Sequence, residues 1–152
     1  ANLDTEPLKI TFTPKEFGYT GLQLNEYLKK CGIVCEFYDP DYVVLMLTPE
    51  NGEETLSEIY RVMSALEKKE RISDVPPQIP TLTAVLPIKQ VLISETETLP
   101  IEQCVGRIFA GINASCPPAV PIAVCGELID HDVIKLLRYY GEEWCEVLKK
   151  PN

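Results

Sequence analysis

Two glutamates lie in apolar surroundings where a carboxylate could bind a cationic group. The first is Glu36, inside the otherwise apolar run Ile33-Val34-Cys35-Glu36-Phe37. A carboxylate buried in such a run loses its hydration unless it meets a partner. Two interpretations are open: a glutamate on an edge strand that faces solvent, or a carboxylate directed at a cationic ligand.

The second glutamate, Glu127, ends a rigid stretch that begins at Cys116. Three prolines in this stretch restrict the backbone and remove amide donors, and residues 122–124 are predicted to form a short strand after them. We interpret Glu127 mainly as an acceptor of hydrogen bonds from the backbone or from an arginine such as Arg107, which would fix the turn after Val124. A functional charge is the alternative.

The other reactive residue types form no recognisable catalytic or metal-binding motif. No CxxC pair occurs, and a single histidine makes a zinc site unlikely, so we expect mainly free, reduced and buried thiols. His131 stands at a predicted helix start, where an exposed first-turn residue is favoured over a catalytic base. Glycine-rich phosphate loops are absent. The six cysteines are Cys31, Cys35, Cys104, Cys116, Cys125 and Cys145.

Composition and charge exclude several classes of partner. The 152 residues have a formal net charge of −9, which argues against nucleic acid because phosphate binding needs a basic surface. No apolar run approaches the roughly 20 residues that span a bilayer, and no charged-then-apolar leader opens the chain, so a cytoplasmic location is predicted. The chain begins at Ala1 rather than at a methionine, which favours a processed chain or an excised fragment.

The first half of the chain predicts the order strand, helix, strand, strand, helix. Residues 8–13 alternate as a strand does, and Thr20 and Gln23 form a capping-box pair before a helix that Gly32 ends. Residues 33–38 and 42–47 are predicted strands joined by a turn, the second apolar throughout and therefore central in a covered sheet. This order predicts an α/β sandwich with helices on one face of a small sheet. The second helix is expected to bury a stripe of Leu56, Ile59, Tyr60, Met63 and Leu66.

The second half predicts a smaller mixed α/β domain. Residues 72–80 are rich in proline and predict an extended linker. Beyond it we expect a short helix at 87–93, a helix at 100–109, a helix capped by Asp130 and stopped by Gly141, and a closing strand at 144–148. The expected domains are therefore residues 1–71 and 81–152.

The chain also resembles the ornithine/lysine/arginine decarboxylases, in particular the shorter, Bacillus-type arginine decarboxylases. Residues 116–121 and the Gly-Arg-Ile and Cys-Gly-Glu runs are similar to the Gly-Arg-Ile, Tyr-Pro-Pro-Gly-Ile-Pro and Pro-Gly-Glu signature of that family's C-terminal domain. Residues 17–21, 32–36, 80–82 and 94–97 resemble its small domain and the link between the two. The chain departs from the pattern at Cys116, Ala119, Cys125 and Gly111, the last being a glutamate in the family. The structural signature comprises Arg107, Pro117, Pro118, Pro121, Gly126 and Glu127.

This resemblance implies a fold, a cofactor and a role for Glu36. Residues 1–71 would be the small domain of the aspartate-aminotransferase fold, and residues 81–152 the family's appended C-terminal domain. The full enzyme would use pyridoxal phosphate to decarboxylate arginine, lysine or ornithine to agmatine or a diamine. The lysine that holds the cofactor follows a histidine in the family's large domain, whereas His131 is followed by Asp132, so this chain would hold no cofactor and would lack that domain. Glu36 would approach the distal cation of the substrate, and the full enzyme would be a homodimer or larger.

Two other functions remain open on the residues alone. Small α/β sandwiches of this order also serve as regulatory modules that bind amino acids or other small effectors. A pure oligomerisation element is the third possibility.

Overall fold

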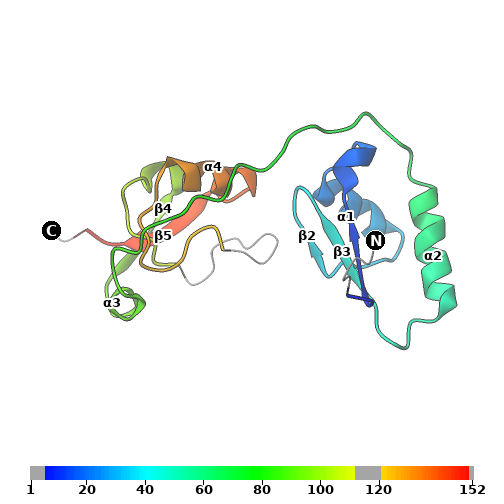
Figure 1. Cartoon of the computed structure of the whole chain (residues 1–152), viewed down its shortest axis with the longest axis horizontal. Coiled ribbons are helices and arrows are strands. Elements are labelled where there is room, and N and C mark those ends of the chain that lie inside the picture. The colour runs from blue at the N-terminus through cyan, green and yellow to red at the C-terminus, as the bar shows by residue number, and fades with distance from the viewer. Residues whose placement is uncertain (1–5, 112–120, 151–152) are drawn as a thin grey trace. The chain divides into compact units, whose positions relative to one another are not determined.

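The computed structural model describes residues 6–111 and 121–150, and the chain divides into two compact units, residues 1–75 and 76–152 (Figure 1). Both units combine helices with small sheets, so the predicted α/β class is confirmed. The division between Val75 and Pro76 falls inside the predicted linker at 72–80. None of the helices in the described part of the chain has the length and apolar character needed to cross a membrane.

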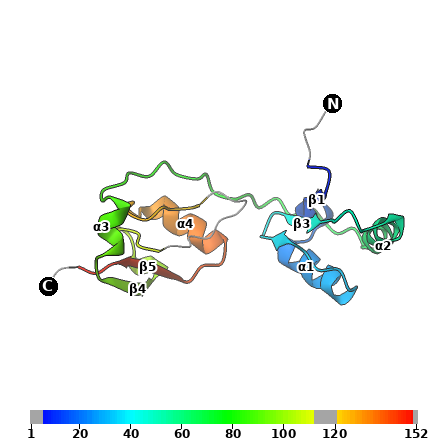
Figure 2. The same ribbon diagram turned by 90° about the horizontal axis from the view of Figure 1, so that it is seen from below.

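The first unit is a three-stranded antiparallel sheet with the central strand predicted from its apolar sequence. The strands β1, β2 and β3 lie in the order β1-β3-β2, so β3 pairs with both neighbours. Helix α1 lies against one face of this sheet, as Figure 2 shows. The elements of the unit are β1 (Lys9–Phe12), the 3-10 turn η1 (Pro14–Phe17), α1 (Gly21–Lys30), β2 (Phe37–Tyr38), β3 (Val43–Met46) and α2 (Glu53–Ser64).

The ends of α1 are formed by the residues that the sequence indicates. The Thr20 side chain accepts a hydrogen bond from the backbone N–H of Gln23, and the Gln23 side chain accepts one from the N–H of Thr20, which is the predicted capping box. Gly32 has φ +81° just after the helix. Cys31, expected among the buried thiols, is exposed beside it.

Only one face of β3 is covered by the described residues, which corrects the expectation of a covered sheet. Val43 and Leu45 are buried among the helices, whereas Met46 is 51% exposed. The buried core of the unit consists of Leu24, Leu28, Val43, Leu45, Ile59 and Val62.

The predicted strand at 33–38 and the predicted stripe of α2 are partly wrong. The N–H of Ile33 donates to the Leu28 carbonyl, so the chain stays at the helix end and β2 begins only at Phe37. In α2 the buried residues are Ile59 and Val62, whereas Leu56 and Tyr60 are exposed. Periodicity alone could not choose between these two faces because both are apolar.

The segment that leaves α2, here called the exit segment (residues 67–74), returns along η1. The N–H of Lys69 donates to the Phe17 carbonyl (3.0 Å) and the N–H of Ile72 to the Lys15 carbonyl (3.0 Å). The Tyr19 hydroxyl donates to the Glu67 carbonyl at 2.7 Å. The exit segment therefore belongs to the first unit although it contains no helix or strand.

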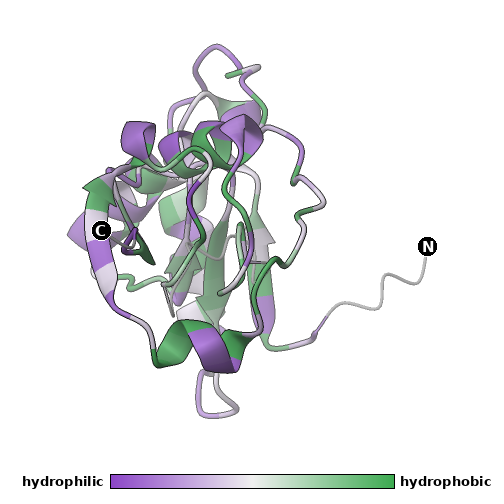
Figure 3. Cartoon of the chain, turned by 90° about the vertical axis from the view of Figure 1, so that its left-hand side faces the viewer, coloured by the Kyte–Doolittle hydropathy of each residue, from purple (hydrophilic) through white to green (hydrophobic). Residues whose placement is uncertain are grey.

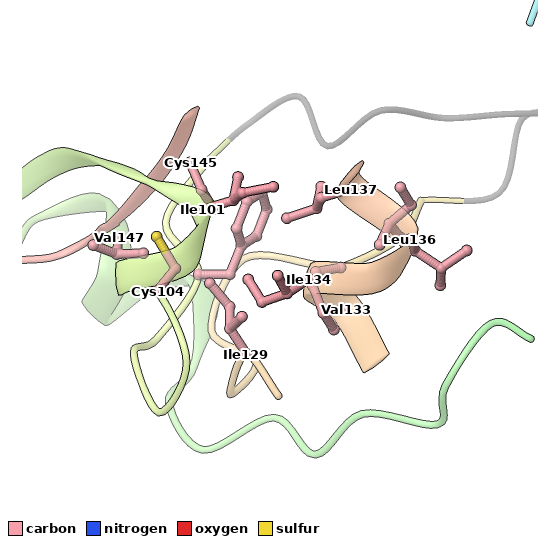
Figure 4. Packing of buried hydrophobic residues seen from close by; sticks show 12 residues of the cluster. Ile101, Cys104, Ile129, Val133, Ile134, Leu136, Leu137, Cys145 and Val147 are labelled. Atoms are coloured by element: carbon pink, nitrogen blue, oxygen red, sulfur yellow. The ribbon is translucent and has the colours of Figure 1, made fainter. Parts of the chain in front are cut away.

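The second unit places one helix over a two-stranded sheet. Its elements are α3 (Ile88–Leu92), β4 (Thr96–Pro100), the 3-10 turn η2 (Ile101–Gln103), α4 (His131–Tyr139) and β5 (Trp144–Leu148). Strands β4 and β5 are antiparallel. Figure 4 shows Val133, Ile134, Leu136 and Leu137 of α4 packed with residues near the sheet, including Ile101, Cys104, Cys145 and Val147. Figure 3 shows apolar and polar residues interleaved along the helices, as expected for helices that bury one face and expose the other.

The short helix, α4 and β5 are confirmed, but the predicted helix at 100–109 and strand at 122–124 are wrong. Residues 96–100 form β4, and Ile108 and Phe109 make bridges to Leu128 and Val147. These long-range backbone pairings outweigh the local helical spacing of the apolar residues. Ile122 and Ala123 are buried at bends rather than in a strand.

Candidate functional site

Glu36 lies on the surface of the first unit, between α1 and β2. Its backbone N–H donates to the Val44 carbonyl at 2.9 Å, which fixes the main chain at the edge of the sheet. Ile33 and Cys35 pack on the core, whereas Glu36 is exposed. In this chain, Glu36 therefore faces solvent next to the edge strand β2, which is the first of the two sequence interpretations. Its carboxylate is not desolvated, although its neighbours in the sequence are apolar.

The carboxylate of Glu36 makes no hydrogen bond or ion pair with any described residue. An exposed carboxylate held on a fixed backbone can pair with an ammonium or guanidinium group presented from outside the chain. The geometry therefore permits the role that the resemblance implies for Glu36.

Arg107 joins the two strands of the second unit. Its guanidinium Nη2 donates to the Glu97 carboxylate at 2.5 Å and also to the Leu148 carbonyl, and the side chain is 10% exposed. The hydrogen bond from Arg107 lowers the pKa of Glu97. Arg107 thus binds Glu97 rather than Glu127, which corrects the partner suggested from the sequence.

Glu127 is bound to the backbone of its own turn. Its Oε2 accepts from the Val124 N–H at 2.7 Å, and its own N–H donates to the Val124 carbonyl at 3.0 Å. The Glu127 carbonyl accepts from the Phe109 N–H at 2.8 Å. These are the contacts that a structural anchor makes, and the role of Glu127 in a larger protein stays a prediction.

Gly126 is held where no other residue fits. It has φ +99°, and a Cβ at this position would lie 2.2 Å from the Leu86 carbonyl oxygen. Its carbonyl accepts from the N–H groups of Val85 and Leu86, and its N–H donates to the Phe109 carbonyl. Pro121 is exposed at the end of the same stretch, and Cys116, Pro117, Pro118 and Ala119 lie outside the described residues.

Gly111, a departure from the pattern that the resemblance implies, is buried against Phe109. A Cβ at Gly111 would lie 2.7 Å from Cζ of the Phe109 ring. The glutamate that the resemblance implies at this position would require that ring to move. A glycine at position 111 therefore allows the Phe109 ring to lie where it does.

The cysteines and His131 form no catalytic or metal-binding group among the described residues. The five described cysteines are unpaired, and burial raises the pKa of Cys145 to about 12, so this thiol stays protonated at neutral pH. His131 is exposed in the first turn of α4. Within residues 6–111 and 121–150, no three His, Cys, Asp or Glu side chains gather as metal ligands.

The described residues do not fit pyridoxal phosphate. A Schiff-base lysine is normally desolvated in a pocket, whereas every described lysine except Lys15 is exposed. Lys15 is held by Asp41 (2.8 Å) and by the Asp74 carbonyl (2.8 Å). None of the described lysines therefore lies in a desolvated pocket formed by the described residues.

Comparison with known proteins gives a family match for most of the second unit. Residues 76–146 match the family model described as Orn/Lys/Arg decarboxylase, C-terminal domain. An arginine decarboxylase of Bacillus anthracis is 31% identical over 147 residues, which covers 91% of this chain and 29% of that protein. An arginine decarboxylase of Bacillus subtilis is 28% identical over 141 residues, covering 87% of this chain and 28% of that protein.

Two solved structures show that the fold extends over both halves of the chain. The constitutive lysine decarboxylase of E. coli has a TM-score of 0.63 at 19% identity, covering 98% of this chain and 33% of that one. A lysine decarboxylase of Francisella novicida has a TM-score of 0.67 at 13% identity, covering 95% and 31%. This chain thus spans about three tenths of the length of each of these relatives. Residues 76–146 match the C-terminal domain of the Orn/Lys/Arg decarboxylases, and 91% of the chain is similar in sequence to an arginine decarboxylase.

Proposed function

We propose that this chain is the C-terminal part of a pyridoxal-phosphate-dependent decarboxylase that acts on arginine, lysine or ornithine. The observation that supports this most is the 31% identity to an arginine decarboxylase over 91% of the chain, which extends well beyond the C-terminal domain into the first unit. The cofactor, held by a large domain outside this chain, supplies the electron sink for loss of carbon dioxide. The first unit is the small domain bordering the substrate site, and the full protein assembles as a homodimer or larger oligomer.

In this proposal the chain contributes substrate discrimination through Glu36. Its carboxylate pairs with the distal ammonium or guanidinium of the amino acid, for which an acidic group is the natural partner. The exposed and unpaired state of Glu36 among the described residues supports this role, since no internal cation competes for it. Binding energy gained at the distal cation orients the substrate and lowers KM.

The activity is tested on the full-length protein. Purified with pyridoxal phosphate, it is expected to release carbon dioxide from at least one of the three basic amino acids, whereas the 152-residue chain alone is expected to release none. Failure of the full-length protein on all three substrates would refute the proposal. A decarboxylation catalysed by the 152-residue chain would refute the assignment of the cofactor to another domain.

The role of Glu36 is tested by Glu36→Gln in the full-length protein. Loss of one charge-assisted pair is expected to raise KM for the preferred basic amino acid roughly tenfold, with a smaller change in kcat. Glu26→Gln is the matched control, because Glu26 is an exposed glutamate of α1 in the same unit. Unchanged KM values for arginine, lysine and ornithine in Glu36→Gln would eliminate this role.

A further inference from the structure

A cavity of about 450 Å³ lies in the first unit between α2 and the β1–η1 segment. This volume is in the range of small-molecule sites. It forms because α2 buries only Ile59 and Val62, leaving Tyr60 and Met63 to line the space beside that contact. The cavity is thus a consequence of how α2 packs.

The lining is apolar with a single positive charge. Its lining residues include the apolar Phe12, Phe17 and Met63, and Lys68 is the one with a charged side chain. Among the described residues, no aspartate or glutamate lines the cavity, although the chain has 23 of them. A bound anion would therefore meet no negative side chain that repels it in this lining.

Lys68 is held in place and is not neutralised by another described residue. It has no ion pair within residues 6–111 and 121–150, and its Nζ lies 5.8 Å from the centroid of the Phe17 ring. The residues on both sides of it are tied to the unit, since the Glu67 carbonyl accepts from the Tyr19 hydroxyl and the Lys69 N–H donates to the Phe17 carbonyl. The exit segment thereby fixes the main chain of Lys68 beside the cavity.

We propose that this cavity binds a small amphipathic carboxylate, an aromatic or aliphatic monocarboxylic acid. The hydrocarbon part occupies the space between Phe12 and Met63, and the carboxylate pairs with the ammonium of Lys68. A cationic amine is disfavoured, because its charge would meet Lys68 and find no carboxylate in the lining. This ligand class differs from the basic side chains of the proposed decarboxylase substrates, so the site is independent of the role assigned to Glu36.

The test is an amide-shift titration of the 15N-labelled 152-residue chain with phenylacetate and hexanoate. Saturable shifts are expected at Phe12, Phe17, Met63 and Lys68, with a Kd on the order of 1 mM for ligands of this size. Phenethylamine and hexylamine, which have similar hydrocarbon parts and the opposite charge, are expected to give no saturable shifts at these residues.

Two variants separate the charge from the cavity. Lys68→Gln is expected to weaken binding of both acids roughly tenfold, whereas Lys30→Gln, at an exposed lysine of α1, leaves it unchanged. Ser64→Phe places a large ring at the cavity wall and is expected to abolish binding with Lys68 intact. Spectra away from the cavity report whether each variant is folded.

Several outcomes would overturn the proposal. They are the absence of saturable shifts with both acids, equal binding of acids and amines, and unchanged affinity in folded Lys68→Gln. Binding that survives in Ser64→Phe would also overturn it. None of these outcomes bears on decarboxylation by the full-length protein, so the two proposals fail independently.

Discussion

At the scale of single residues, the described part of the family signature is a set of backbone cross-links. The Arg107 side chain connects β4 to the end of β5, and the Glu127 carboxylate closes the turn at Val124. The carbonyl of Gly126 accepts hydrogen bonds from the backbone N–H groups of residues 85 and 86. Their residue types are explained by the chain geometry of the second unit.

Gly126 provides a residue-scale prediction with a matched control. Gly126→Ala combines a left-handed backbone with a clash at the Leu86 carbonyl, so it is expected to reduce the free energy of unfolding of the second unit by about 2–4 kcal/mol. Gly141→Ala has a similar φ of +82° but no atom within 4 Å of the added Cβ, and is expected to cost about 1–2 kcal/mol. Denaturant unfolding measures both, and equal losses would show that the Leu86 contact does not matter.

At the scale of elements, helices with end signals and the strands β1, β3 and β5 were predicted well, whereas β4 and the bridges at Ile108 and Phe109 were not. The capping box of α1, the Asp130 cap of α4 and the glycines that follow both helices are local features. Strand β4 and the bridges at Ile108 and Phe109 depend on partners more than 15 residues away. An apolar spacing that suits a helix was therefore overridden by long-range pairing.

The cap of α4 supplies an element-scale prediction. Asp130 Oδ1 accepts from the N–H groups of Asp132 and Val133, both at 2.9 Å. Asp130→Ala is expected to lower the free energy of unfolding of the second unit by about 1 kcal/mol, whereas Asp130→Asn keeps an acceptor and should lose only a few tenths. If both variants unfold at the same denaturant concentration, the acceptor oxygen is not what stabilises the helix.

At the scale of the whole molecule, the chain is two separately packed units with a short connection. The exit segment is bonded to η1 as far as Ile72 and Asp74, and the division follows at Val75. Each unit has its own buried core. The long relatives that this chain matches contain a further seven tenths of polypeptide. These relatives are arginine decarboxylases, which supports the proposed function for a full-length protein rather than for these two units alone.

An insertion series tests this organisation. Four residues, Gly-Ser-Gly-Ser, inserted after Gln78 are expected to leave the unfolding of both units nearly unchanged, because no bond of the exit segment is broken. The same insertion after Glu70 displaces Ile72 and Asp74 from Lys15 and is expected to destabilise the first unit by about 1–2 kcal/mol. Thermal unfolding followed by circular dichroism distinguishes them. A comparable loss from both insertions would contradict the division at Val75.

The candidate sites divide in the same way between local and tertiary information. Glu36 could be singled out from the sequence because an acidic residue in an apolar run is conspicuous. The sequence left open whether Glu36 is exposed, because its exposure depends on Ile33 staying at the end of α1. The cavity beside Lys68 has no sequence signal. Its lining comes from two stretches, residues 11–24 and residues 60–68, which are far apart in the chain.

The sequence by itself determined the α/β class, the ends of α1 and α4, the central place of β3 and the resemblance to the decarboxylases. Caps, apolar runs and short motifs are formed by neighbouring residues, so no tertiary contact is needed to find them. Only the tertiary structure decided that Arg107 binds Glu97, that residues 96–100 form a strand, and that α2 buries Val62 and exposes Tyr60. These outcomes depend on which distant groups meet when the core closes. Local spacing leaves several such pairings equally acceptable, and packing selects one of them.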